Sequence, residues 1–262
     1  MEPNDYDMIF KRKSFHIFRG TGRLSAQELQ DIRTRIESLT PLAEGIQTAL
    51  RIVPREQTTC RRGEYCVLFY SERKEGYLQN IGYLGGQLDL WLASREIGAC
   101  WYGMGKPEAA YPGPENIPSN DGTTSEELEF VIMLAIGKAA PSDFRRDYTK
   151  AKRKLLEEIW IGDPLEGVSQ TVRFTPSACN TQPWLVERGG NRLALYRILG
   201  KRGIMPRDRV SYYNRIDLGI FQLFLELCLT HEGYSFTREL YPDEGGDQEK
   251  TLTAVYELLA AE

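Results

Sequence analysis

The sequence lacks the residue patterns that most often hold a structural metal or a disulfide framework. Its 262 residues include five cysteines and two histidines, and no Cys-x-x-Cys pair occurs. Spaced cysteines and imidazoles are the usual ligands of zinc, and disulfide frameworks need an even number of cysteines. We therefore expect no metal site and reduced thiols, which favours a cytoplasmic location.

Long apolar runs and a strong excess of one charge are also missing. No stretch approaches the roughly 18 apolar residues of a membrane helix, and residues 1–13 mix acids and bases where a secretory signal would be apolar. The balance of 33 basic and 37 acidic residues gives a net charge of −4. Nothing in this balance favours nucleic acid, so we expect neither a membrane nor nucleic acid as a partner.

Familiar phosphate-binding and hydrolase motifs are absent as well. The sequence contains no Gly-x-Gly-x-x-Gly, no Gly-x4-Gly-Lys-Ser/Thr and no Gly-x-Ser-x-Gly. These absences disfavour a Rossmann dehydrogenase, a P-loop NTPase and a serine hydrolase built on a nucleophile elbow.

What the sequence does contain is an alternation of helical and strand patterns, which indicates an α+β fold. Helical spacing of apolar residues marks the helices, and Ser25 with Glu28 forms a capping box at the start of one of them. Short apolar runs mark buried strands. The expected helices cover residues 25–39, 76–97 and 145–158, the expected strands 66–70, 99–102 and 130–136, and the expected loop 107–125.

Two separate segments recur at the same interval. Thr40–Gly45 resembles Thr175–Asn180, and residues 80–98 resemble residues 215–233, both with an offset of 135 residues. One shared offset without a net gap indicates an internal duplication. We expect two related halves, 1–150 and 151–262, which pack as the subunits of a dimer would around antiparallel or mixed sheets.

Three segments could carry chemistry, and each has a plainer structural alternative. Residues 11–18 (KRKSFHIF) could clamp a phosphate or form a solvated charge run. Residues 175–184 (TPSACNTQPW) offer polar groups on a loop held by prolines, or a tight connection into the core. Residues 148–154 could close a phosphate site or form a basic helix face. The residues alone leave these alternatives open.

Together these segments resemble the FMN-dependent nitroreductase superfamily. RKSFHIF is similar to its Arg-x-Ser-x-Arg-x-Phe signature, and PSACNTQPW is similar to its Pro-Ser-x-x-Asn-x-Gln-Pro-Trp signature. Residues 79–103 resemble the central helix and following strand, and residues 132–139 with 152–158 resemble a late strand and a basic element. The resemblance implies a nitroreductase-like fold.

The order of the two signatures departs from the family pattern. Family members are homodimers with FMN at the interface, one subunit giving the basic segment and the other the Pro-Ser loop. Here the Pro-Ser loop lies in the second half, and the matching residues Pro41–Gly45 of the first half have lost Ser and Asn. The resemblance therefore implies a monomeric, fused pseudo-dimer with one intact flavin site.

The implied activity is that of an FMN-dependent oxidoreductase. It would take reducing equivalents from NAD(P)H and pass them to an electron-poor small molecule such as a nitroaromatic or a quinone. Two alternatives stay open: another flavin-dependent reduction, such as a dehalogenation, and a non-catalytic flavin-binding protein. We identify no catalytic acid or nucleophile, since the cofactor carries the redox chemistry.

The resemblance also carries over cofactor-binding residues. His16 stands where the family usually has Arg or Lys, and a neutral imidazole stabilises an anionic reduced flavin less than a fixed cation does. The expected cofactor-binding residues are Arg12, Lys13, Ser14, His16, Tyr102, Gly103, Lys152, Lys154, Pro176, Ser177 and Asn180.

Overall fold

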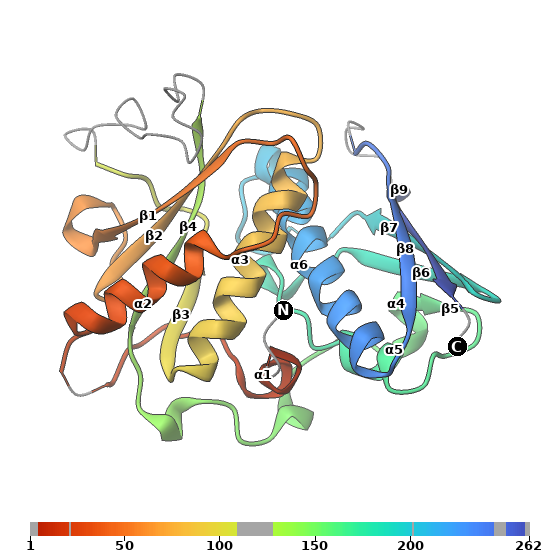
Figure 1. Ribbon diagram of the computed structural model, residues 1–262, viewed down its shortest axis with the longest axis horizontal. Coiled ribbons are helices and arrows are strands. Elements are labelled where there is room, and N and C mark those ends of the chain that lie inside the picture. The colour runs from red at the N-terminus through yellow and green to blue at the C-terminus, as the bar shows by residue number, and fades with distance from the viewer. Residues whose placement is uncertain (1–4, 21, 109–127, 201, 244–249, 260–262) are drawn as a thin grey trace.

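The structure, a computed structural model, describes residues 5–20, 22–108, 128–200, 202–243 and 250–259. Two sheet-containing halves lie on either side of a pair of long crossing helices (Figure 1). Among the described residues no helix combines the length and the apolarity needed to cross a membrane.

The first half contains a four-stranded antiparallel sheet. Its strand order is β1-β2-β4-β3, and the long helix α3 connects β2 to β3. The helices α1 and α2 precede the sheet. The bounds are α1 Asp5–Lys11, α2 Ala26–Glu37, β1 Thr48–Pro54, β2 Tyr65–Ser71, α3 Tyr77–Ser94, β3 Ile97–Tyr102 and β4 Glu129–Lys138.

The second half contains a five-stranded mixed sheet of order β5-β6-β7-β9-β8. The short edge strand β5 runs parallel to β6, and the other pairs are antiparallel. The helix α6 connects β7 to β8. The bounds are α4 Leu156–Ile159, β5 Trp160–Ile161, α5 Val168–Val172, β6 Trp184–Gly189, β7 Arg192–Ile198, α6 Val210–His231, β8 Ser235–Leu240 and β9 Lys250–Leu259.

The two sheets share a topology once β5 is set aside. The order β6-β7-β9-β8 repeats the order β1-β2-β4-β3, and in each sheet the long helix follows the second of these strands. The loop before each first strand is also held alike. Asn80 Oδ1 of α3 accepts a hydrogen bond from Ala43 N at 3.4 Å, and Asp217 Oδ1 of α6 accepts one from Ala178 N at 2.9 Å. Ala43 and Ala178 are 135 residues apart.

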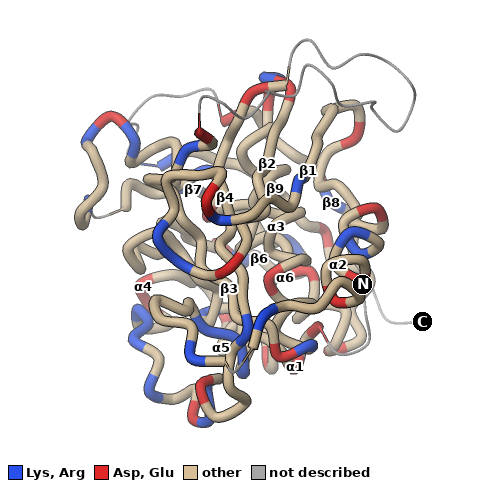
Figure 2. Tube along the Cα trace, turned by 90° about the vertical axis from the view of Figure 1, so that its left-hand side faces the viewer, with Lys and Arg blue, Asp and Glu red and all other residues tan. Residues whose placement is uncertain are grey.

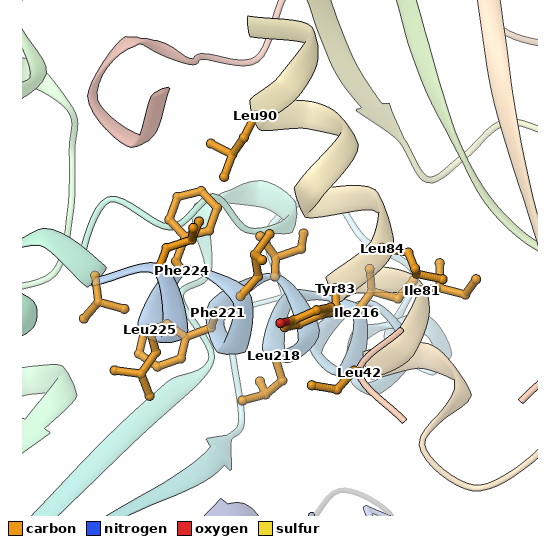
Figure 3. Close-up of a cluster of buried hydrophobic side chains, with 14 of the residues drawn as sticks. Leu42, Ile81, Tyr83, Leu84, Leu90, Ile216, Leu218, Phe221, Phe224 and Leu225 are labelled. Carbon is orange, nitrogen blue, oxygen red and sulfur yellow. The ribbon is translucent and has the colours of Figure 1, made fainter. Parts of the chain in front are cut away.

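The crossing of α3 and α6 is closely packed because glycine stands at the contact on both helices. A Cβ on Gly82 would lie 2.0 Å from Ile216 O, and a Cβ on Gly219 would lie 1.8 Å from Gln79 O. Only hydrogen fits there, so the two backbones touch. Apolar side chains from both helices surround this contact and form the centre of the core (Figure 3).

Most expected elements are present. The capping box between Ser25 and Glu28 starts α2, and the expected strands correspond to β2, β3 and β4. The expected helix over 145–158 is wrong: this stretch has a single 3₁₀ turn at 148–150, then extended backbone, and α4 begins at Leu156. Side chains of the second half hold the extended part, where Gln182 Oε1 accepts from Lys154 N at 2.9 Å. Residues 109–125 of the expected loop lie outside the described residues.

Candidate functional site

The N-terminal segment runs along the edge of the first sheet. Ser14 pairs with Ala99 of β3 in a parallel bridge, and Phe15 N donates to Ala99 O at 2.9 Å. The buried Phe15 ring packs against Phe144, with ring centroids 4.9 Å apart, and lies over Gly98. This anchoring fixes the positions of the polar residues on either side of Phe15.

Three arginines from two segments cluster beside this edge. Arg12 is buried, and its Nε lies 3.2 Å from Asp89 Oδ2 of α3. Arg145 N donates to Lys11 O at 3.0 Å, which places Arg145 beside the segment that carries Arg12. Burial lowers the pKa of Arg145 and, more strongly, lowers the pKa of Arg153 to about 9. The charge of Arg12 lowers both pKa values further. Against them the structure sets the Asp89 carboxylate, so the cluster has an excess of positive charge.

Among the described residues, three buried nitrogens of this cluster make no hydrogen bond, and one of the three, Arg12 Nε, has the Asp89 carboxylate as an ion-pair partner. Within the part of the chain that the structure describes, Arg145 Nη1 and Arg153 Nε have no hydrogen-bond partner. Unpaired buried donors are costly, especially on charged groups. An arrangement of this kind suits a dianion such as a phosphate, whose oxygens accept charge-assisted hydrogen bonds from guanidinium groups. Basic stretches of the chain gather near α4 and α5 (Figure 2).

The loop before β6 joins this cluster from the second half. Arg153 Nη1 donates to Asn180 Oδ1 at 3.0 Å, and Asn180 Nδ2 donates to Lys152 O at 3.1 Å. Cys179, Asn180 and Gln182 have φ values of 50°, 55° and 50°. Non-glycine residues in this left-handed region cost of order 1–3 kcal/mol each and often occur at binding sites.

Two side chains of the second half hold this strained loop. Ser177 Oγ accepts from Gln182 N at 2.9 Å, which closes the loop on itself. Asp217 Oδ1 accepts from Ala178 N at 2.9 Å. Burial raises the pKa of Asp217 to about 8, so the carboxyl group keeps its proton at neutral pH. Asp217 therefore positions the loop without adding a negative charge near the arginines.

The end of β3 meets α6 at a glycine. Tyr213 OH donates to Gly103 O at 2.6 Å, and a Cβ on Gly103 would lie 2.7 Å from Tyr213 Cε1. The neighbouring Tyr102 ring lies under a guanidinium group, since the Arg62 Cζ is 5.7 Å from its centroid. The end of the strand thus contacts residues from both halves.

Arg62 also contacts His16. Its Nη1 is in close contact with His16 Nδ1 and donates to Cys100 Sγ at 3.5 Å. Burial and the Arg62 charge lower the pKa of His16, so the imidazole is neutral at neutral pH. The fixed positive charge beside His16 therefore belongs to Arg62, a residue 46 positions further along the chain.

Comparison with known proteins places this arrangement in a family. A family model described as "Putative TM nitroreductase" matches residues 4–228. The chain belongs to this nitroreductase family. No curated protein matches the chain.

One solved structure supports the fold of this nitroreductase family member. The structure of a "putative nitroreductase" from Thermotoga maritima has a TM-score of 0.60 and 16% identity, covering 98% of this chain and 94% of that chain. A "putative NADH oxidase" from Clostridium acetobutylicum reaches a TM-score of 0.42 at 12% identity, covering 60% of this chain and 100% of that chain. The first likeness shows the fold alone.

The structure brings some of the residues expected to bind the cofactor into the arginine cluster. Arg12 lies in it, and Asn180 and the Lys152 carbonyl contact Arg153. Ser14, His16 and Tyr102 lie along the neighbouring edge of β3, with Ser14 Oγ 3.4 Å from Cys100 Sγ.

The expected lysines are placed less directly. Lys13 Nζ lies 5.1 Å from the Phe15 ring centroid, and Lys154 Nζ donates to Gln182 O at 2.9 Å. The Lys152 side chain is exposed. Pro176, partly buried, begins the loop that Ser177 closes.

The sequence did not mark four residues that the structure places at the site: Arg62, Arg145, Arg153 and Asp217. Arg153 stands between the two expected lysines, Lys152 and Lys154. The sequence pattern therefore identified the correct segment but not the arginine within it. Arg62 follows Arg61, and Arg145 precedes Arg146. Adjacent arginines usually indicate a solvent-exposed surface, so nothing in the sequence favoured either residue. Asp217 had one available signal, since a carboxyl group in an otherwise apolar helix is rarely buried without a role.

Proposed function

We propose that this nitroreductase family member is an FMN-dependent oxidoreductase that passes reducing equivalents from NAD(P)H to an electron-poor small molecule of the nitroaromatic or quinone type. The observation that carries the proposal is the cluster of the buried Arg12 and the partly buried Arg145 and Arg153, whose unpaired donors adjoin the strained loop that holds Asn180. The family assignment supports an oxidoreductase.

The residues present fit the phosphate of FMN. The unpaired donors Arg145 Nη1 and Arg153 Nε would gain acceptors, and the charge excess of the cluster would be offset. Neutral Asp217 holds the loop without repelling the phosphate. When bound, FMN supplies the hydride and electron transfer, and the protein supplies binding, orientation and electrostatics.

Arg62 adds a positive charge to the site that does not belong to the arginine cluster. It contacts Tyr102 and His16, both expected at the flavin. A fixed cation near the ring system favours a flavin that gains negative charge on reduction. We propose that Arg62 takes the role that the neutral His16 does not fill.

We also propose that the chain is a monomeric pseudo-dimer with one flavin site. The shared strand order of the two sheets supports two related halves. At the position in the first half that corresponds to the Pro-Ser loop, Leu42 O accepts from Arg238 Nη2 at 2.6 Å, and Arg238 Nη1 pairs with Glu226 Oε1 at 2.6 Å. A satisfied ion pair there supports a closed second site.

The decisive experiment is the visible spectrum of the purified chain, incubated with FMN and freed of excess, with the flavin quantified after acid release. We expect one FMN per chain and bleaching by NADH or NADPH without oxygen. Two FMN per chain would contradict the closed second site. No bound FMN would overturn the proposed function, and binding without bleaching would favour a flavin-binding protein.

Replacing Arg62 by glutamine is expected to lower the midpoint potential of bound FMN and weaken sulfite binding to the flavin roughly tenfold. A sulfite adduct is anionic, so it depends on the same nearby cation as the reduced flavin, and tenfold corresponds to about 1.4 kcal/mol. Spectral titration with sulfite measures this directly.

The matched control for Arg62 is its exposed neighbour Arg61. Arg61→Gln removes the same charge from the same loop and is expected to leave sulfite affinity unchanged. Equal effects of the two variants would point to the loop's general charge, and no effect of either would remove Arg62 from the site.

A further inference from the structure

Two buried thiols lie side by side next to the candidate site. Cys60 stands on the loop before β2, and Cys66 is the second residue of that strand. Both belong to one cluster of buried side chains in the first half. Thr58 Oγ1 links them further: it accepts from Cys60 N at 3.1 Å and lies 3.5 Å from Cys66 Sγ.

The surroundings shift the pKa values of the two thiols in opposite directions. Pairing with the Cys66 side chain lowers the pKa of Cys60, and the backbone N–H of Arg62 at 3.4 Å and the charges of Arg62 and Arg55 act in the same direction. The same pairing and burial raise the pKa of Cys66. Cys60 is thus the better nucleophile, and Cys66 holds its proton until Cys60 has reacted.

The other cysteines lack this arrangement. Cys100 Sγ accepts from Ser14 Oγ and Arg62 Nη1, at 3.4 and 3.5 Å. Cys228 is buried in the main core among apolar side chains. Cys179 is exposed on the loop before β6, where it lies beside Gly203.

We propose that Cys60 and Cys66 form a redox-active dithiol that hydrogen peroxide converts to an intramolecular disulfide. The Cys60 thiolate attacks one peroxide oxygen, the O–O bond breaks, and a sulfenic acid forms on Cys60. The hydroxide that leaves takes up the proton that the Cys60 thiol had released and becomes water. The Cys66 thiol then attacks the Cys60 sulfur, the S–S bond forms, and the sulfenic oxygen leaves as a second water. Two thiols and one peroxide give one disulfide and two waters.

Only a small oxidant can reach the Cys60 thiol, because Cys60 is 5% exposed. The loop that carries Cys60 adjoins 3₁₀ turn 55–57, whereas Cys66 is fixed between two strands, opposite Val53 and Ala135. Movement of the loop would therefore close the bond. Because Arg62 lies between the two cysteines, the disulfide would also constrain the segment that carries this cation.

The test uses the full chain with Cys179→Ser, which removes the exposed thiol and prevents cross-linking between chains. After treatment with a few equivalents of hydrogen peroxide and alkylation under denaturing conditions, we expect two fewer free thiols and no added oxygen. Trypsin cleaves after Arg61 and Arg62, so a disulfide links peptides 56–61 and 63–73. Dithiothreitol should restore both thiols.

Two variants separate the roles. Cys66→Ala should leave Cys60 as a sulfenic acid that dimedone traps, and Cys60→Ala should leave Cys66 unreacted at the same peroxide dose. The reaction rate should rise with pH through the neutral range, as more Cys60 becomes thiolate. A link between Cys60 and Cys100, or retention of both thiols in the Cys179→Ser chain, would overturn the proposal. Neither reaction nor readout involves flavin, so the outcome is independent of the proposed function.

Discussion

Replacing Arg145 by glutamine is expected to weaken FMN binding about 10- to 150-fold. A hydrogen bond to a charged group contributes about 1.5–3 kcal/mol, and each 1.4 kcal/mol is a factor of ten in affinity. Arg145 suits the test because its side chain has an unused buried nitrogen and its positive charge is disfavoured by burial and by Arg12. Without FMN, the variant should be as stable as the parent chain or more stable, since a like-charge repulsion is removed.

The control is again the next residue along the chain. Arg146 is exposed, and Arg146→Gln removes the same formal charge a residue away. Fluorescence titration with FMN and with riboflavin separates phosphate recognition from ring binding: Arg145→Gln should affect FMN and leave riboflavin binding nearly unchanged. If riboflavin binding falls as much as FMN binding, or if Arg146→Gln has the same effect, the cluster does not bind the phosphate.

The fold was predictable from the sequence where local periodicity decides the structure. The capping box at Ser25 and the apolar runs of β2, β3 and β4 depend on near neighbours, and these elements are present. The close approach of Gly82 to Ile216 of α6, by contrast, was not predictable from the local pattern. Partners across the fold are set by packing, which the local pattern does not contain.

The basic stretch 145–158 shows what overrides local pattern. Its residues have fair helix propensity, yet long-range contacts hold the segment extended. Arg173 Nη2 and Nε donate to Lys154 O, at 2.8 and 3.1 Å, and Gln182 Oε1 accepts from Lys154 N. Tertiary hydrogen bonds replace those that a helix would make, so the stretch presents Arg153 to the cluster.

The site was predictable in its segments and less so in its residues. Arg12, His16 and the loop with Asn180 follow from the resemblance, since motif positions map one to one. Arg153 and Arg62 do not, because whether an arginine is buried depends on which carboxylates and carbonyls surround it. The sequence therefore predicted only the neutral imidazole of His16 at this position, whereas the structure places the Arg62 guanidinium beside it from another loop.

Replacing Glu226 by leucine is expected to lower the free energy of unfolding by about 3–5 kcal/mol, because removing one partner leaves a charge uncompensated in the interior. Glu226 is buried and accepts hydrogen bonds from Tyr83, Tyr256 and Arg238, at 2.8, 2.9 and 2.6 Å. Arg238 in turn reaches Leu42 O, so the network joins the second half to the first. Urea denaturation followed by circular dichroism measures the change.

The double variant Glu226→Leu with Arg238→Met tests whether the loss of stability comes from the uncompensated charge of Arg238. Removing both charges should recover part of the stability, because the uncompensated guanidinium is gone while the two tyrosine hydroxyls still lack their acceptor. Glu232→Gln, on an exposed residue just after α6, controls for general loss of negative charge and should change little.

Each folded variant should still bind one FMN, since the network lies at the position where the second site is closed. Loss of FMN binding in the folded double variant would place the network in the flavin site itself. A second FMN there would show that the ion pair alone keeps the other site closed.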